Sequence, residues 1–313
     1  METMNDTNII KMFEEDCNIR GLSKYTIQSY RSSLNLFSDF LDTKGINLFD
    51  VDRNILRDYI KYLREKDISQ KTIENRFSAF SALYDYSVYE KLMEKNIVND
   101  IRKRYLKTYK ENGGSTIRRK LINVEEMSKF IMSILDTRDK AICLLFAKTG
   151  IRRRELVAID LNDINWDENS ITLKPTHKRS NRVVFFDHEC AMVLKRWLNK
   201  RKLIVDSANK ALFVSYINKK KRLNRNGVGY VFVKWAESAG LHDPVSDRLE
   251  DKFTCHCCRV WQNTFLRRAG MPREFIATLR GDAINSAFDI YYHIDMEELR
   301  KSYLACIPQL GLD

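Results

Sequence analysis

The sequence predicts a mainly α-helical protein with a small β-hairpin or sheet, divided into two domains. Its length of 313 residues exceeds the roughly 100–200 residues of one ordinary domain. Gly (11) and Pro (4) are scarce, which disfavours a β-sandwich, a barrel or a Gly-rich nucleotide fold. Apolar residues recur at three- and four-residue steps along much of the chain, as one face of a helix requires.

Residues 1–108 are predicted to form a helical first domain. Three apolar stripes at helical spacing indicate three helices that share a core. Ser23 or Thr26 is placed to cap the first helix, and Ser69 and Thr72 lie near the start of the third. The stripes consist of Ile27, Tyr30, Leu34, Phe37 and Leu41, then Leu56, Tyr59, Ile60 and Leu63, then Ile73, Phe77, Phe80, Leu83 and Tyr84.

Residues 109–118 are predicted to be a basic linker. The pair Gly113-Gly114 favours a flexible chain, and Lys and Arg residues flank it on both sides. Arg118, Arg119 and Lys120 close this stretch, and we expect them to contact the phosphate backbone of a nucleic acid.

Residues 119–313 are predicted to form a second, mixed α/β domain. Asn123 and Glu126 have the spacing of a capping box, so a helix begins there. A second, strongly apolar helix runs through residues 141–147. Short strands at 170–173 and 182–186 indicate a hairpin. The remaining helices are expected near residues 188–201, 228–240, 256–269, 272–280 and 296–307.

The charge balance indicates a polyanionic partner. Lys and Arg number 54 and Asp and Glu number 42, a formal charge of +12, and nucleic acid is the leading partner for such a chain. The apolar run 141–147 is far shorter than the roughly 20 residues that span a bilayer, and residues 1–8 lack a hydrophobic signal core. We therefore expect a cytoplasmic, DNA-associated protein without a membrane partner, its seven Cys reduced.

Three motifs carry residues suited to phosphate chemistry. They are Thr-Gly-Ile-Arg-Arg-Arg-Glu-Leu at 149–156, His-Cys-Cys-Arg at 256–259, and Leu-Arg-Gly-Asp at 279–282 followed by Tyr291. Guanidinium groups match phosphate oxygens bidentately, a histidine can donate to the same phosphate, and a tyrosine hydroxyl can act as a covalent nucleophile. Because the tyrosine pKa is ordinarily near 10, this nucleophile needs an electropositive site.

The order and spacing of these motifs resemble those of the tyrosine recombinase (phage integrase) superfamily over essentially the whole chain. The resemblance implies a helical core-binding (SAM-like) domain followed by a mixed α/β catalytic domain. It implies that Arg152 is the first catalytic arginine, with Glu155 supporting the site, and that His256 and Arg259 form the second catalytic pair. It also implies that Tyr291 is the nucleophile, with the neighbouring Tyr292 as its rival.

Two positions depart from the family pattern. Asp282 stands where the family usually has His or Trp, so it is expected to support the site, for example by orienting Arg259. The family carries a lysine in this hairpin, and ungapped counting back from Arg182 places His177 at its position, with Lys178 one residue away. We prefer Lys178 as the acid for the leaving oxygen; His177 and Lys174 stay open. Two further cations of the hairpin, Arg179 and Arg182, are expected to contact DNA.

The function implied by the resemblance is site-specific recombination of double-stranded DNA at attachment sites through a 3′-phosphotyrosine intermediate. It implies a homotetramer on DNA and needs no cofactor or metal. The alternatives are a non-catalytic DNA-binding protein with a decayed site, or a resolvase or type IB-like topoisomerase that uses the same chemistry. The adjacent Cys255–Cys258 run lacks zinc-site spacing. The divergent hairpin and Asp282 favour an integrase of a mobile element or virus.

Overall fold

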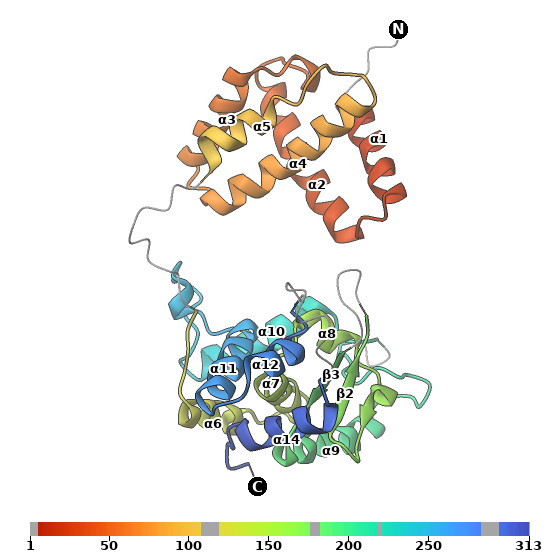
Figure 1. Cartoon of the computed structure of the whole chain (residues 1–313), viewed down its shortest axis with the longest axis vertical. Coiled ribbons are helices and arrows are strands. Elements are labelled where there is room, and N and C mark those ends of the chain that lie inside the picture. The colour runs from red at the N-terminus through yellow and green to blue at the C-terminus, as the bar shows by residue number, and fades with distance from the viewer. Residues whose placement is uncertain (1–5, 108–118, 176–181, 218–220, 283–293, 313) are drawn as a thin grey trace. The chain divides into compact units, whose positions relative to one another are not determined.

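The computed structural model describes residues 6–107, 119–175, 182–217, 221–282 and 294–312 (Figure 1). The chain forms two compact units, Met1–Gly114 and Ser115–Asp313. The division between them falls inside the predicted linker at 109–118. Each unit has its own core, so each is described by itself.

The first unit is all helical within its described residues. Ser23 caps α2 by accepting from the backbone N–H of Thr26 over 3.1 Å, and Ser69 caps α4 in the same way. Its elements are α1 (Asp6–Ile19), α2 (Lys24–Asp42), the 3₁₀ turn η1 (Leu48–Asp50), α3 (Arg53–Glu65), α4 (Gln70–Tyr89), α5 (Val98–Ile101) and the π-helical turn η2 (Arg102–Leu106). The three predicted helices are present as α2, α3 and α4, and α1 was not foreseen.

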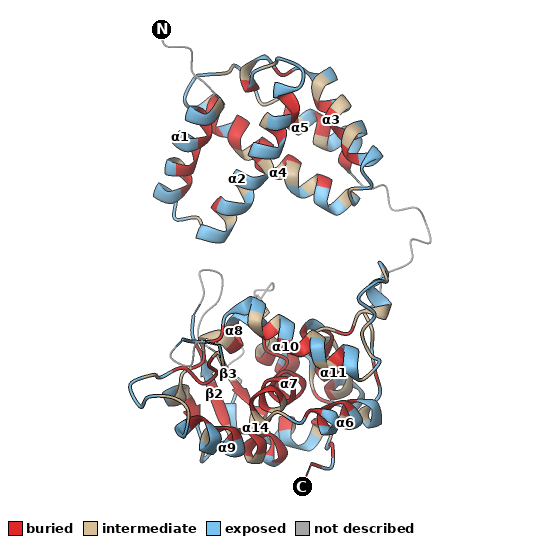
Figure 2. Cartoon of the chain, turned by 180° about the vertical axis from the view of Figure 1, so that it is seen from behind, coloured by how far each residue is buried: buried red, intermediate tan, exposed pale blue. Residues whose placement is uncertain are grey.

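An aromatic cluster forms the centre of this unit. The ring centroids of Phe37 and Phe80 are 4.5 Å apart, and those of Phe37 and Tyr59 are 4.8 Å apart. All three side chains come from the predicted apolar stripes. Figure 2 shows buried and exposed residues alternating along these helices, as amphipathic helices require.

The second unit is built from helices with one small sheet. Its helices are α6 (Val124–Ser133), α7 (Thr137–Thr149), α8 (Arg153–Ala158), α9 (His188–Lys202), α10 (Arg225–Ser238), α11 (Cys255–Arg268), α12 (Arg273–Arg280) and α14 (Met296–Cys306), with 3₁₀ turns η3 (Leu161–Asp163) and η4 (Leu249–Asp251). Asn123 and Glu126 form the predicted capping box at the start of α6, with hydrogen bonds of 2.8 and 2.7 Å.

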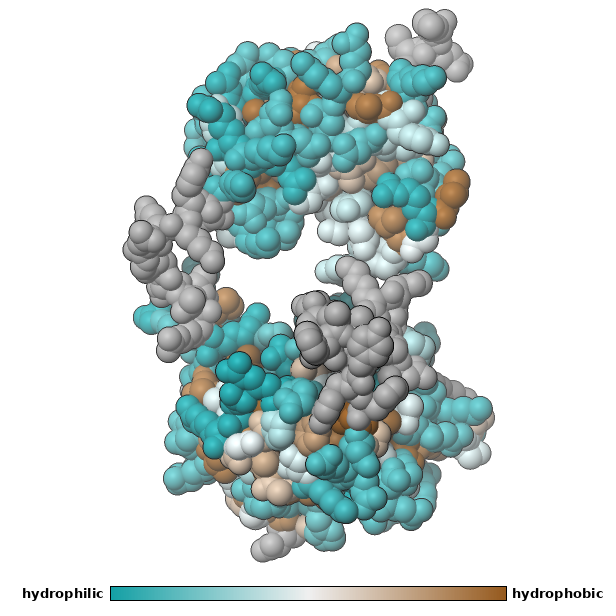
Figure 3. Space-filling view, viewed as in Figure 1, coloured by the Kyte–Doolittle hydropathy of each residue, from teal (hydrophilic) through white to brown (hydrophobic). Residues whose placement is uncertain are grey.

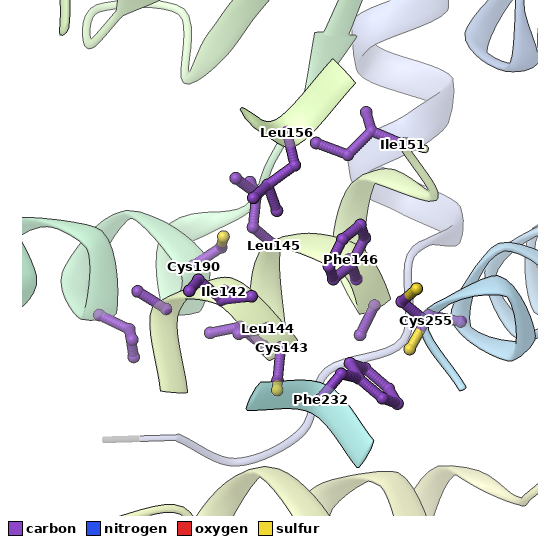
Figure 4. Packing of buried hydrophobic residues seen from close by; sticks show 14 of the residues in the cluster. Ile142, Cys143, Leu144, Leu145, Phe146, Ile151, Leu156, Cys190, Phe232 and Cys255 are labelled. Atoms are coloured by element: carbon purple, nitrogen blue, oxygen red, sulfur yellow. The ribbon is translucent and has the colours of Figure 1, made fainter. Parts of the chain in front are cut away.

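Helix α7 is the core of this unit. It is buried nearly all round, as expected for its continuous apolar run at 141–147. Figure 4 shows its side chains meeting Leu156 of α8, Cys190 of α9, Phe232 of α10 and Cys255 of α11. Helices α8, α9, α10 and α11 therefore pack against the buried helix α7. This packing sets the position of the C-terminal end of α7.

The sheet is antiparallel in the order β1 (Ile164–Asn165), β2 (Ser170–Leu173) and β3 (Arg182–Phe185). Ile171 pairs with Val184, and both are buried. The hairpin predicted from residues 170–173 and 182–186 is present, although β3 ends one residue earlier and β1 adds a third strand. A second apolar cluster, which includes Phe185, Leu279 and Tyr303, joins β3 to α12 and α14.

On the face shown in Figure 3, hydrophilic side chains cover most of the described surface of each unit. Among the helices described, none is both long and apolar enough to cross a membrane.

Candidate functional site

A sharp turn at the end of α7 delivers the first arginine of the predicted site. Gly150 ends α7 with a φ of +58°, a left-handed conformation that favours glycine. A Cβ atom at this position would lie 2.4 Å from Oε1 of the buried Gln262 in α11. Two residues later, Arg152 stands at the N-cap of α8 with its side chain 35% exposed. The motif therefore carries a guanidinium from a buried helix to the surface.

The second arginine reaches the same place from α11. Arg259 is buried, and its Nη1 donates to the carbonyl oxygen of Gly150 over 2.8 Å. Its Nη2 donates to the carbonyl oxygen of Arg280 over 2.8 Å, and Nη1 of Arg152 donates to the same oxygen over 3.4 Å. The structure thus brings together the two guanidinium groups that the motifs predict to converge, at the end of α12.

Glu155 supports Arg152 from the interior side. Its side chain is 6% exposed, Oε2 accepts from the backbone N–H of Arg152 over 2.6 Å, and Oε1 accepts from Nη1 over 3.3 Å. Burial by itself would raise the pKa of Glu155, but hydrogen bonds and charge from Arg182 and Arg152 hold that pKa below its ordinary value. The carboxylate is therefore ionised at neutral pH and fixes Arg152 at both its backbone and its side chain.

Arg182 differs from its predicted role as a DNA contact. Its side chain is 9% exposed, and its Nη1 and Nη2 donate to the two oxygens of Glu155 over 2.6 and 2.9 Å. Its Nε donates to the carbonyl oxygen of Leu279 over 3.0 Å. Gly281, at φ +60°, leaves space for this side chain, because a Cβ atom there would lie 2.8 Å from Cδ of Arg182. All three guanidinium nitrogens are engaged within the domain, so Arg182 links β3, α8 and α12 rather than facing a phosphate.

The site is strongly electropositive. Burial is the largest cause that lowers the pKa of Arg259 to about 10, and nearby positive charges lower it further. These charges belong to Arg152, Arg280 and Arg182. Burial disfavours any charge here, but the repulsion among these guanidinium groups is relieved when an anion binds between them. The cluster therefore suits a phosphate group of a nucleic acid.

His256 lies at the start of α11 and is exposed. Its partial desolvation lowers the pKa of its imidazole, and the charge of Arg119 is the next largest cause. Arg259, Arg152 and Arg280 act in the same direction. His256 is therefore electrostatically coupled to the arginine cluster. The charge of Arg119 thus reaches the site from the start of the second unit. Arg119 and its neighbour Lys120 are both half-buried.

Asp282 lies at the edge of the cluster. One carboxylate oxygen is 3.6 Å from Nη2 of Arg259, and the other is 2.8 Å from Nε of Arg280. Its side chain is 36% exposed. Asp282 is therefore closer to Arg280 than to Arg259, and its carboxylate partly offsets the positive charge of both.

Of the three candidates for the acid in the hairpin, only Lys174 lies within the described residues. Lys174 ion-pairs with Asp160, and its Nζ lies 3.4 Å from an oxygen of Asp163. Its charge is thus already matched by two carboxylates of the η3 turn. The other predicted site residues, His177, Lys178, Arg179, Tyr291, Tyr292 and Arg118, lie outside the described residues.

Arg280 is the one residue of the cluster to which the sequence motifs assigned no role. Its carbonyl oxygen is the acceptor that Arg152 and Arg259 share, and its charge acts on His256. Its place inside the Leu-Arg-Gly-Asp motif is the signal that could have pointed to it. The neighbouring Cys255, Cys257 and Cys258 are buried in the core while His256 is exposed, so these residues point in different directions from one helix end.

Two family models match this chain, one for each of its units. Residues 120–298 match the phage integrase family, and residues 8–105 match the phage integrase SAM-like domain. The chain belongs to the phage integrase family of tyrosine recombinases, enzymes that cleave and rejoin DNA in site-specific recombination. Its catalytic domain is therefore the second unit, and its partner is DNA.

Two relatives and one solved structure illustrate the likeness. The chain is 28% identical over 293 residues to the tyrosine recombinase XerC of Psychromonas ingrahamii, covering 93% of this chain and 92% of the relative. It is 26% identical over 309 residues to XerC of Bacillus subtilis, covering 97% and 98%. The structure of the XerH site-specific recombinase bound to difH substrate has a TM-score of 0.66 at 18% identity, covering 95% of this chain and 84% of that one. The last comparison shows the shared fold.

Proposed function

We propose that this chain cleaves one strand of double-stranded DNA at an attachment site through Tyr291, leaving a 3′-phosphotyrosine. The observation that carries this proposal is the meeting of Arg152 and Arg259 at the carbonyl oxygen of Arg280, in a cluster whose charge acts on His256. Such a cluster can bind a scissile phosphate and neutralise the charge that builds on a five-coordinate phosphorane.

In the proposed reaction, the hydroxyl of Tyr291 loses its proton to water, which the electropositive site favours. The resulting phenolate oxygen attacks the phosphorus while Arg152, Arg259 and His256 hold the phosphate oxygens. The bond from phosphorus to the 5′ oxygen breaks, and Lys178 gives that oxygen its proton. The free 5′-hydroxyl of a partner strand then attacks the phosphotyrosine in the reverse step. One phosphodiester replaces another, so the exchange needs neither a nucleotide nor a metal ion.

We assign the general acid to Lys178 in preference to the other hairpin candidates. Lys174 is less suitable because Asp160 and Asp163 already hold its ammonium. His177 is the second choice, since a neutral imidazole is a weaker proton donor than an ammonium-bearing side chain placed beside a leaving oxygen. A cleavage assay of the two alanine variants ranks them.

Further cations around the site extend its contact with the DNA backbone. Arg119 and Lys120 lie at the start of the second unit, and the charge of Arg119 acts on His256. We propose that they contact phosphates next to the cleavage point, together with Arg118 and Arg179. The net charge of +12 supports binding that weakens as salt rises.

We further propose a homotetramer on DNA and an origin in a mobile element or virus. Exchange between two duplexes breaks four strands, so four protomers are required. The departure at Asp282 supports an integrase rather than a housekeeping resolvase. We place the protein in the cytoplasm, associated with DNA. Strand-exchange products on supercoiled plasmids separate integration from resolution and from topoisomerase-like relaxation.

A nicked suicide duplex tests the proposed nucleophile. The nick beside the cleavage point lets the short 5′-hydroxyl fragment leave, so a covalent protein–DNA adduct accumulates. We expect the adduct with the native chain and with Tyr292→Phe, and its loss with Tyr291→Phe. An adduct that persists in Tyr291→Phe and disappears in Tyr292→Phe would assign the nucleophile to Tyr292. Binding of attachment-site DNA without any adduct would favour the non-catalytic alternative.

A further inference from the structure

Lys148 is a fully buried lysine just before the motif that carries Arg152. Its side chain is 0% exposed, and its Nζ donates to Asp187 over 2.5 Å, to Glu189 over 2.6 Å and to the carbonyl oxygen of Pro308 over 2.7 Å. A buried ammonium is tolerated only where such partners replace water. The three bonds match its three hydrogens, so Lys148 is fully engaged.

The segment Pro308–Leu312, here called the closing segment, completes this buried network. One ammonium and two carboxylates leave one negative charge in excess. The backbone N–H of Leu310 donates to both oxygens of Glu189, over 3.0 and 2.9 Å, and that of Leu312 donates to Oε1 over 2.9 Å. These donors stabilise the extra charge, because N–H groups aimed at a carboxylate favour its ionised form. The network and the closing segment therefore depend on each other.

The backbone of Lys148 is tied to other parts of the site. Its carbonyl oxygen accepts from Nε2 of Gln262 over 3.0 Å and from the hydroxyl of Tyr303 over 2.9 Å. Gln262 lies on α11, one turn after Arg259, and Tyr303 lies on α14.

The partners of the Lys148 side chain lie beyond the end of β3. Asp187 caps α9, two residues after β3, which carries Arg182. One residue of α7, four positions before Arg152, thus bonds to groups of α9, α11, α14 and the closing segment.

We propose that Lys148, Glu189 and the closing segment are a positioning device for Arg152. Their bonds hold the end of α7 against α9 and the closing segment, and the carbonyl oxygen of Lys148 joins the same end to Gln262 on α11. Together these contacts set where the turn at Gly150 places Arg152 relative to Arg259. The closing segment is then needed for DNA cleavage although it lends no group to the phosphate. This inference rests on the proposed role of Arg152 in the reaction.

Two variants of the full chain test the device. Glu189→Gln keeps the shape of the side chain and removes its charge, and a chain that stops after Ile307 removes the closing segment. Cleavage of the nicked duplex is followed in a single turnover with protein in excess, so that the rate constant and the amplitude are separate readings. DNA affinity is measured by gel shift. The matched control is Glu297→Gln, whose carboxylate is 71% exposed and pairs with Lys301.

We expect either variant to lower the cleavage rate constant about tenfold or more, the scale expected when a catalytic group is displaced. DNA affinity and reaction amplitude should match those of the native chain and of Glu297→Gln. A rate constant equal to the native one overturns the inference. A lower amplitude with an unchanged rate constant also overturns it, since that result assigns the network to stability alone.

Hydrogen exchange gives a reading that is independent of activity. The backbone N–H of Arg152 is bonded to Glu155, and we expect it to exchange faster in Glu189→Gln than in Glu297→Gln. This result would support the inference even if the native chain formed no adduct, which would count against the proposed function. Equal exchange in the two variants would contradict the positioning device.

Discussion

Arg152 and Arg182 both bond to Glu155, yet they face different surroundings. Arg152 is 35% exposed and shares the Arg280 carbonyl oxygen with Arg259. Arg182 is 9% exposed, and its two terminal guanidinium nitrogens donate to the two carboxylate oxygens of Glu155. At the scale of single residues, the existing hydrogen bonds of each guanidinium group decide whether it can bind a phosphate. Arg152 is accessible to one, and Arg182 is not. A bidentate Arg–carboxylate pair is among the strongest side-chain contacts.

This difference predicts how Arg182→Gln behaves. The substitution removes the fork that holds Glu155, so we expect the rate constant of DNA cleavage to fall about 10- to 100-fold. Because Arg182 faces no phosphate, the slope of log affinity against log salt should stay unchanged. Gel shifts at several salt concentrations, together with single-turnover cleavage, measure both quantities.

Lys120→Ala is the matched comparison, since Lys120 is a proposed phosphate contact. Its salt slope should become shallower by about 0.9, the value for one lost contact to duplex DNA. A similar change in the slope for Arg182→Gln would return Arg182 to the set of DNA contacts.

At the scale of elements, the site is built from helix ends. The end of α7 carries the turn to Arg152, the start of α11 carries His256, and the end of α12 carries the carbonyl oxygen that both catalytic candidates share. Helix ends have unpaired backbone groups and can be aimed by their caps. The left-handed turn at Gly150 is the sharpest of these constraints, because both its φ and its neighbours exclude a side chain.

Gly150→Ala should therefore destabilise the fold more than the same change at Gly240. Gly240 also has a positive φ, of +67°, but a Cβ atom there meets nothing within 4 Å. Both variants should lose about 1–2 kcal/mol for the left-handed backbone. Gly150→Ala should lose about 1–3 kcal/mol more, since it must displace the buried Gln262. Urea unfolding of the second unit measures the two free energies, and equal losses would show that Gln262 moves freely.

At the scale of the whole molecule, the chain has separate hydrophobic cores. Among the described residues, the buried apolar side chains of Met1–Gly114 form one cluster, and those of Ser115–Asp313 form two others. Each unit has the size at which a domain can bury enough apolar surface to fold alone. All of the described site residues therefore lie in the catalytic unit, and the helical SAM-like unit contributes none of them.

We expect the two units, produced as separate chains, each to unfold in one cooperative transition. Calorimetry of the full chain should then show two transitions whose midpoints match those of the separate units. Noncooperative unfolding of either fragment, or loss of its helical circular dichroism, would show that one core depends on the other.

Local sequence patterns predict much of the fold and part of the site. The apolar stripes predicted α2, α3 and α4, and the pair Asn123 and Glu126 predicted the start of α6. These features are local, because a helix and its cap depend on residues three or four positions apart. The left-handed turn at Gly150 was not predicted, although it too depends on a local feature, the glycine that ends α7. The motif spacing also predicted that Arg152 and Arg259 would converge.

The sequence by itself determined most of the long helices, the caps at Ser23, Ser69 and Asn123, the basic charge and the motifs that identify a tyrosine recombinase. Only the tertiary structure decided that Arg182 holds Glu155, that Lys174 is paired with Asp160, and that a buried lysine joins the closing segment to the site. The physical reason is that these contacts join segments far apart in the chain. Which charged groups meet there depends on how the entire core packs, and no local pattern of residues records it.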